Sequence, residues 1–135
     1  MATASASLRL PVAADTVWKL VGGFLSLPDW LPFIASSEPA EGGRLRKLTT
    51  ADGAVIVERL ETYDNQARTY SYSITEGPFP VTDYFATLKV EASGDSETLV
   101  TWSGRFTPNG ISEVEAQALF QGVYDGGLQA LKGNF

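Results

Sequence analysis

The stretch SEVEAQALFQGVYDGGLQAL, residues 112–131, is the part of the sequence that decides the fold class. Its apolar positions recur at the i, i+3, i+4 and i+7 spacing of a helix that lies on an apolar surface. The stripe formed by this spacing consists of Ala116, Leu119, Phe120, Val123, Gly127, Ala130 and Leu131. The stretch therefore predicts a long amphipathic helix, and the residues before it must supply the surface that it covers.

Three glycines, Gly122, Gly126 and Gly127, lie inside this predicted helix. Each costs roughly 0.5–1 kcal/mol of helix stability relative to alanine. Two explanations are open at this point. The glycines either let the helix approach its neighbour closely or leave space for a ligand beneath it.

The residues before this helix follow a different pattern. Between residues 36 and 106 no helical period is visible, and segments with strand character are separated by turn residues. These segments predict strands at 35–39, 43–50, 54–63, 67–76, 82–92 and 97–107. Their connections are short, which implies an antiparallel meander.

The N-terminal part adds one strand and two short helices. Residues 3–10 predict a first strand, which ends because proline follows and cannot donate a hydrogen bond to a sheet. Asp15 or Thr16 is expected to cap a helix that runs to Val21, and a second short helix is expected within residues 24–33. The element order predicts an α+β fold, in which a curved antiparallel sheet wraps around the long C-terminal helix.

Composition limits the classes of function. The chain has 135 residues without a break in composition, so a single domain over residues 1–135 is expected. The net charge of −6 disfavours nucleic acid as a partner, because that binding depends largely on lysine and arginine. Neither cysteine nor histidine occurs, which excludes thiol nucleophiles, histidine bases and the usual zinc or copper ligand sets. We therefore expect no metal site and no cofactor.

The sequence also bears on location and assembly. No apolar run approaches the roughly 18–20 residues of a membrane span, and the N-terminus does not resemble a signal peptide. A cytoplasmic location is therefore expected. The oligomeric state is left open, although the first strand or an exposed loop could mediate formation of a homodimer.

Four segments carry a resemblance to a known superfamily: LPVAADTVWKLV at 10–21, LPDWLP at 27–32, ERLE at 58–61 and VTW at 100–102. Together with the element order, they make the chain resemble the START-like superfamily, which includes the Bet v 1 allergens and small bacterial polyketide cyclase/dehydrase-like proteins. The resemblance covers nearly the whole chain. It implies a helix-grip fold with an apolar cavity between sheet and helix, which binds lipids, polyketides or other hydrophobic small molecules.

Turn positions predict the register of the strands, because paired residue numbers in a hairpin sum to a constant. A turn centred on Asp52 places Arg46 opposite Glu58 and Leu48 opposite Ile56. The faces of neighbouring strands then agree with one another.

The same reasoning applies to the later strands. A turn near residues 94–95 places Leu88 opposite Trp102 and Tyr84 opposite Phe106, and alternation places Thr62 on the inner face. The residues expected to line the cavity are Arg46, Glu58, Tyr70, Tyr72, Tyr84 and Trp102 from the sheet and Ala116, Phe120 and Val123 from the helix.

Several of these residues have two interpretations. The Arg46–Glu58 pair either gives the cavity a polar anchor or is a structural ion pair that makes a buried Glu58 tolerable. The inner tyrosines either fill the sheet core or donate hydrogen bonds to a ligand. Phe79, at a loop tip, either packs under its loop or guards the mouth of a pocket.

Three functions follow. The leading hypothesis is binding of a small hydrophobic or aromatic ligand, lipid or polyketide-like, since no recognisable catalytic set is present. The second is a polyketide cyclase/dehydrase-like enzyme with Glu58 as acid or base, a role that Arg46 opposes because it would lower the pKa of Glu58. The third is a non-catalytic interaction protein whose core is filled by side chains.

Overall fold

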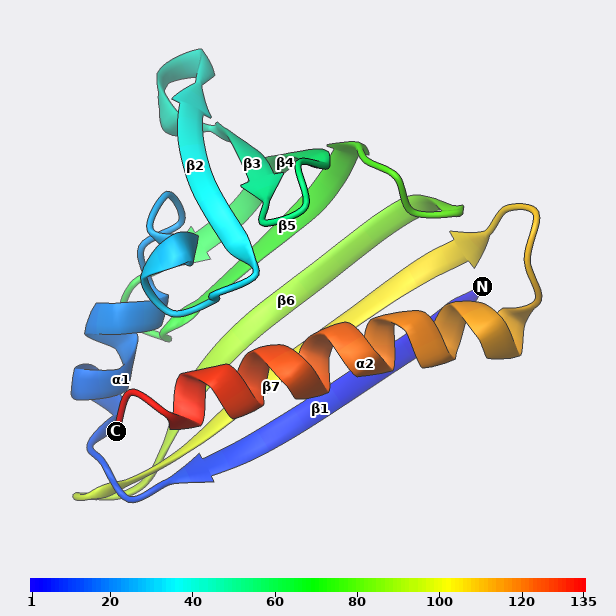
Figure 1. Cartoon of the computed structure of the whole chain (residues 1–135). Helices are drawn as coiled ribbons and strands as arrows, with labels where there is room; N and C mark the ends of the chain where they lie inside the picture. Colours follow the sequence, from blue (N-terminus) through cyan, green and yellow to red (C-terminus); the bar gives the residue numbers. More distant parts are fainter.

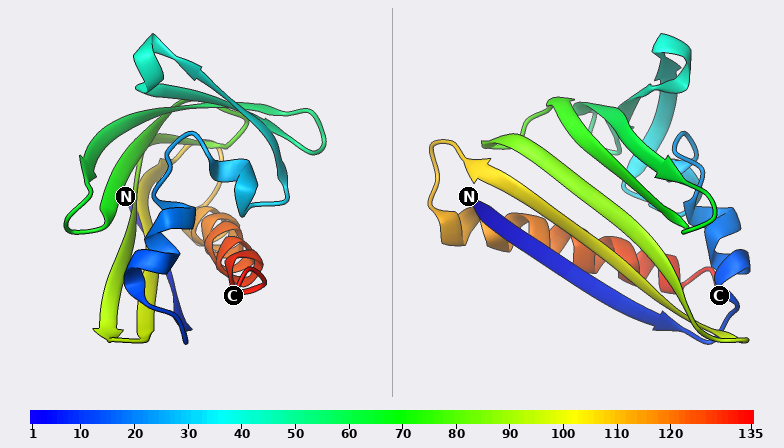
Figure 2. Two further views of the ribbon diagram at one scale, coloured as in Figure 1. Left: turned by 90° about the vertical axis from the view of Figure 1, so that its left-hand side faces the viewer. Right: turned by 180° about the vertical axis from the view of Figure 1, so that it is seen from behind.

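Seven antiparallel strands form one curved sheet, and a long helix crosses its concave face (Figure 1). The computed structural model describes residues 1–135. The strands are β1 (Ala2–Leu10), β2 (Ile34–Ala40), β3 (Leu45–Thr50), β4 (Val55–Asp64), β5 (Thr69–Glu76), β6 (Val81–Gly94) and β7 (Glu97–Pro108), in the sheet order β1-β7-β6-β5-β4-β3-β2. The left view of Figure 2 shows the sheet curling around the helix. This arrangement confirms the expected helix-grip fold.

The helical elements are α1 (Ala14–Val21), α2 (Glu113–Lys132) and two 3-10 turns, η1 (Leu27–Asp29) and η2 (Glu41–Gly43). The expected cap of α1 at Asp15 or Thr16 is wrong. The carbonyl of Ala13 accepts the N–H of Thr16 at 3.0 Å, so the helix begins earlier and Asp15 lies in its first turn. A capping box between Ser112 and Glu115 begins α2. Neither α1 nor α2 combines the length and apolar character that a membrane-spanning helix requires.

β1 connects the beginning of the chain with its last strand and helix. Every residue of β1 has a partner in β7. The side-chain amide of Gln117 in α2 donates to the carbonyl of Thr3 at 3.1 Å, and that of Gln121 donates to the carbonyl of Ser5 at 2.8 Å. The first strand is therefore held on one side by β7 and along its inner face by α2.

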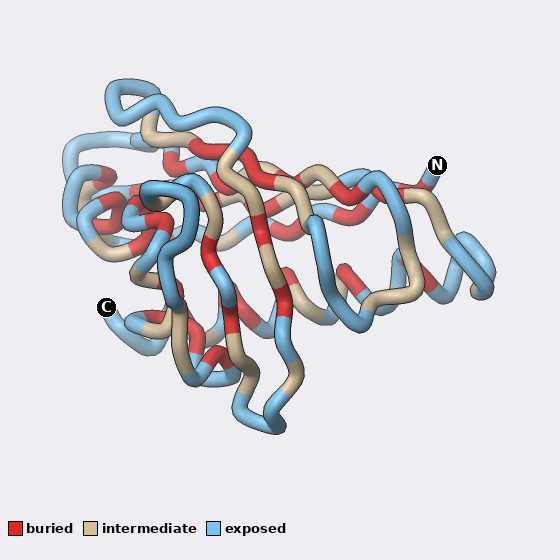
Figure 3. The backbone as a smooth tube through the Cα atoms, turned by 90° about the horizontal axis from the view of Figure 1, so that it is seen from above, coloured by how far each residue is buried: buried red, intermediate tan, exposed pale blue.

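The β3–β4 hairpin has the register that its turn predicts. Arg46 lies opposite Glu58, and Leu48 lies opposite Ile56. All four side chains are buried. Figure 3 shows buried and more exposed positions alternating along the strands, as expected for a sheet with one covered face.

A bulge between β4 and β5 changes one inner position. The register shifts between Leu60 and Thr62, so Tyr63 rather than Thr62 lies opposite Tyr70. The rings of Tyr63 and Tyr70 stack with 6.2 Å between their centroids, and the expected inner position of Thr62 is wrong. An inserted residue moves every later side chain to the other face, and simple alternation does not reveal it.

The β6–β7 hairpin confirms the pairing of Leu88 with Trp102. Near its other end the ladder shifts beside Tyr84, where Asp83 has a φ of 54°. Tyr84 therefore lies in a bulge, yet its ring still stacks on Phe106, 6.1 Å away between centroids. The expected contact between Tyr84 and Phe106 is confirmed, although the two residues are not paired in the regular hydrogen-bond ladder.

The face of α2 that covers the sheet is rotated from the predicted stripe. Tyr124 and Leu128 are buried, whereas Leu119 is 36% exposed and Val123 and Ala130 are only half-buried. The buried row of α2 is Ala116, Phe120, Tyr124, Gly127, Leu128 and Leu131. Tyr124 is not part of the predicted stripe, although it follows Phe120 at the i+4 spacing.

The glycines of α2 differ in their surroundings. A Cβ on Gly127 would lie 2.5 Å from Cζ3 of Trp102, so this glycine lets α2 approach β7 closely. A Cβ on Gly122 or Gly126 would meet no atom within 4 Å. Close approach therefore explains Gly127 alone, and the other two glycines neither contact the sheet nor make room beneath the helix.

Candidate functional site

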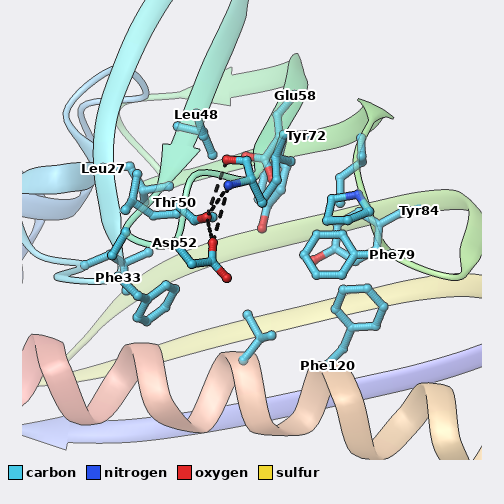
Figure 4. Close-up of a pocket in the computed structure, with 18 of the residues that line it drawn as sticks. Leu27, Phe33, Leu48, Thr50, Asp52, Glu58, Tyr72, Phe79, Tyr84 and Phe120 are labelled. Carbon is cyan, nitrogen blue, oxygen red and sulfur yellow. Dashed lines mark hydrogen bonds between the residues drawn. The ribbon is translucent and has the colours of Figure 1, made fainter.

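A cavity of about 460 Å³ lies between the concave face of the sheet, the segment around η1 and the middle of α2 (Figure 4). Of the 19 residues that line it, 15 are hydrophobic. The lining residues are Leu27, Leu31, Phe33, Ile34, Leu48, Thr50, Ala51, Asp52, Ala54, Ile56, Glu58, Tyr72, Ile74, Pro78, Phe79, Tyr84, Trp102, Phe120 and Val123. This size and apolar character are typical of small-molecule sites, which commonly enclose roughly 300–1,000 Å³.

Three connecting segments form the open side of the cavity, because their residues there are partly or fully exposed. Figure 4 shows Phe33, after η1, and Phe79, in the β5–β6 loop, on opposite sides with Asp52 of the β3–β4 turn between them. The turn is closed by Thr50, whose hydroxyl donates to the carboxylate of Asp52. Phe79 also packs on Phe120, with 5.2 Å between ring centroids, so it both lies at the mouth and contacts α2.

Glu58 is the buried carboxylate of the cavity. Nε and Nη2 of Arg46 lie 2.8 and 2.7 Å from its Oε1 atom. Its Oε2 atom receives no hydrogen bond from the chain. Glu58 lines the cavity and Arg46 does not, so the ion pair presents its acidic member to the interior.

Arg46 lies behind Glu58, enclosed by aromatic rings. Its Nη1 atom donates to the carbonyl of Phe24 at 2.6 Å. Its Cζ atom is 4.1 Å from the ring centroid of Phe24 and 5.0 Å from that of Tyr72. The guanidinium is therefore satisfied by a carboxylate, a carbonyl and ring faces, and only 1% of the residue is exposed.

Burial raises the pKa of Glu58 above its ordinary value, and the guanidinium of Arg46 opposes this rise. The expected contribution of Arg46, which lowers the pKa of Glu58, has the predicted direction, and desolvation of the carboxyl group outweighs it. Burial acts to lower the pKa of Arg46, but Glu58 and the neighbouring tyrosines raise it overall. Since arginine keeps its proton, an ionised Glu58 leaves the pair without net charge.

The hydroxyls of the inner tyrosines join two short hydrogen-bonded pairs. The indole N–H of Trp102 donates to the hydroxyl of Tyr72 at 3.0 Å. The hydroxyls of Tyr84 and Tyr124 lie 2.5 Å apart. Burial raises the pKa of Tyr72, Tyr84 and Tyr124, so these phenols stay neutral under ordinary conditions.

Gly104 in β7 makes the position of Tyr124 possible. A Cβ at Gly104 would overlap the hydroxyl oxygen of Tyr124. The ring of Tyr124 also packs on Trp102, with 4.9 Å between centroids. The hydroxyl of Tyr124, from the helix, thus occupies the space that a side chain at position 104 would fill.

The structure brings together most of the predicted site residues. Those that line the cavity are Glu58, Tyr72, Tyr84, Trp102, Phe120 and Val123. Arg46 and Tyr70 are buried behind Glu58, within 3.5 Å of each other between Nη1 and Oη. Ala116 is fully buried in α2 but does not line the cavity.

Two parts of the lining were missed at the sequence level. Leu27, Leu31 and Phe33 come from the segment around η1, which the sequence presents only as a proline-rich short helix. Thr50 and Asp52 come from a turn, where their residue types are ordinary. The apolar residues at 27, 31, 33 and 34 are a signal that this segment covers something apolar, but not what it covers.

The family described as "Polyketide cyclase / dehydrase and lipid transport" matches residues 1–135. No functionally curated protein shows significant similarity to the sequence. The structure contains no group of three or more acidic side chains that could hold a metal ion.

Solved structures agree with this match. The protein XoxI from Bacillus cereus has 48% sequence identity and a TM-score of 0.97, with 100% of this chain and 96% of that chain covered. An uncharacterised protein from Bacillus thuringiensis has 47% identity and a TM-score of 0.97, over 99% of this chain and 98% of that one. The Zhui aromatase/cyclase from Streptomyces has 17% identity and a TM-score of 0.78, over 98% of this chain and 92% of that one, a likeness of fold alone.

Proposed function

The chain belongs to the polyketide cyclase/dehydrase and lipid transport family, and from this premise we propose that it binds a small hydrophobic or aromatic molecule between the sheet and α2. The observation that carries the proposal is the apolar cavity of about 460 Å³ with one buried carboxylate in its wall. Small-molecule sites typically combine apolar walls with a few placed polar groups.

The cavity persists although many aromatic rings lie close to it. Phe120 packs on Tyr84 and on Phe106, with 4.9 and 4.6 Å between ring centroids, and Trp102 packs on Tyr124. These rings fill part of the space beneath α2, and the cavity occupies the rest. A protein with a completely filled core is therefore not favoured.

The neutral dye N-phenyl-1-naphthylamine, whose fluorescence rises in apolar surroundings, tests this proposal. We expect saturable binding to the protein. Val123→Trp places a large side chain at the cavity wall and should abolish the signal. The matched control Val114→Trp, on the same helix at a position that is 74% exposed, should bind the dye like the unmodified protein. Absence of saturable binding, or equal loss in both variants, would refute the proposal.

A second candidate function is suggested by Glu58. Its Oε2 atom is free, and burial raises its pKa, which is the direction that a general acid or base acting near neutral pH requires. A cyclase/dehydrase-like enzyme would use this carboxyl group to move a proton at a carbon next to a ligand carbonyl. The Zhui protein from Streptomyces, which shares the fold of this chain, is an aromatase/cyclase and so has an activity of this class.

Glu58→Gln separates the two functions. If Glu58 is the acid or base, the variant retains dye binding and loses turnover of any ligand that the unmodified protein converts. Retained turnover in Glu58→Gln would eliminate Glu58 from the chemistry. Binding without turnover by the unmodified protein would leave ligand binding as the function.

A further inference from the structure

We propose that Glu58 makes the cavity selective for uncharged ligands with a hydroxyl group and that the cavity rejects carboxylates. This inference rests on the proposed binding function. The ionisable acidic and basic groups that line the cavity are Glu58 and Asp52, and no lysine or arginine is among them. An anionic head group therefore finds no positive partner in the wall.

The geometry of Arg46 prevents it from serving as that partner. Its Nε and Nη2 atoms face Oε1 of Glu58, and its Nη1 atom faces the carbonyl of Phe24. The ring faces of Phe24 and Tyr72 cover the guanidinium. A ligand anion would have to displace Glu58 from Arg46 and would leave one of two carboxylates without a counter-charge. Such uncompensated buried charge is strongly unfavourable.

The free oxygen of Glu58 favours a hydrogen-bond donor instead. Oε2 accepts nothing from the chain, and a ligand hydroxyl can donate to it without changing the net charge of the pair. The hydroxyl of Tyr72 accepts the indole N–H of Trp102, which leaves its own O–H as a donor. A ligand hydroxyl can both donate and accept, so it matches the carboxylate of Glu58 and the hydroxyl of Tyr72, which both line the cavity.

Competition against bound N-phenyl-1-naphthylamine at pH 7 tests the selectivity with three naphthalenes of similar size. We expect 2-naphthol to compete about tenfold or more better than 2-methylnaphthalene, as one hydrogen bond to a charged group implies, and 2-naphthoate to compete least. Equal competition by 2-methylnaphthalene or 2-naphthoate would overturn the inference while leaving ligand binding intact. Failure of the dye itself to bind would refute the binding function and this inference with it.

Variants assign the selectivity to a residue. In Glu58→Gln the amide oxygen is needed by Arg46, so the amide NH₂ faces the cavity, and the advantage of 2-naphthol over 2-naphthoate should shrink at least tenfold. Glu61→Gln, an exposed site on the same strand, should keep the original ranking. If Asp52→Asn removes the selectivity and Glu58→Gln does not, the assignment to Glu58 is wrong. Circular dichroism verifies folding, and the ranking by the unmodified protein decides the inference if Glu58→Gln does not fold.

Discussion

The contact between Gly104 and Tyr124 allows a quantitative prediction. Gly104→Ala adds a methyl group that overlaps the hydroxyl of Tyr124, so either the helix or the ring must move. Overpacking of this kind costs about 1–3 kcal/mol of unfolding free energy. Tyr124→Phe removes the hydroxyl and leaves that of Tyr84 without its 2.5 Å partner, at a cost of about 1–3 kcal/mol.

The two substitutions should not add. When the hydroxyl is removed by Tyr124→Phe, the atoms nearest to the new methyl group are the ring Cζ at position 124, at 3.2 Å, and Cβ of Ala86, at 3.5 Å. Shifts of a few tenths of an ångström accommodate these distances. Gly104→Ala should therefore lower the free energy of unfolding by at least about 1 kcal/mol less in the Tyr124→Phe background than in the unmodified protein.

Urea unfolding of the unmodified protein, the two single variants and the double variant measures this coupling. Tryptophan fluorescence and circular dichroism follow the unfolding. Gly122→Ala is a useful control because it adds the same methyl group where no atom lies within 4 Å. If the single costs of Gly104→Ala and Tyr124→Phe add to within about 0.5 kcal/mol, the two sites are independent and the reasoning fails.

Three further predictions concern other parts of the molecule. Gly126→Ala should stabilise the protein by about 0.5–1 kcal/mol, because its methyl group meets no other atom. Gly127→Ala should destabilise the protein, because its methyl group collides with the indole of Trp102. The midpoint of thermal unfolding should rise in the first variant and fall in the second. Arg46→Met should cost about 3–5 kcal/mol because it leaves a buried carboxylate alone, and adding Glu58→Leu should restore most of that loss in urea unfolding. Burial raises the pKa of Tyr84 above 10.0, so the stability that its neutral form contributes is complete below pH 10 and is lost as the pH rises through the folded-state value. An ultraviolet pH titration should show this phenol ionising only together with unfolding, and its ionisation in the folded protein near pH 10 would contradict its burial.

The sequence allowed the hairpin registers to be predicted where turns are regular. Arg46 faces Glu58 because a short turn determines which residues pair, and this one relation located the main polar feature of the cavity. Alternation along the neighbouring strands identified the inner residues that surround that pair. Cross-strand position, however, did not show that Arg46 lies behind Glu58 rather than beside the ligand space. That difference depends on side-chain direction and on the rings that cover the guanidinium.

The errors have two physical causes. Thr62 and Tyr63 exchange faces because of a bulge, which inserts one residue without an obvious signal in the sequence. Tyr124 lies outside the predicted stripe, and its burial depends on a glycine on the facing strand, which gives its hydroxyl a place in the core. Each depends on a partner in another element, and periodicity within one segment contains no information about that partner.

The pairing of β1 with β7 has a consequence for how the chain reaches its native state. β1 precedes every other element of this fold in the chain, whereas β7, which pairs with it, and α2, which covers it, come after all the others. Gln121 and Ser5, joined in the native protein, are separated by 116 positions in the sequence. Contacts between such distant segments form slowly, because a long loop must close before they are made. We therefore expect β1 to pair with β7 only after the meander has formed, and the docking of α2, which carries Phe120 and Val123, to complete the walls of the cavity.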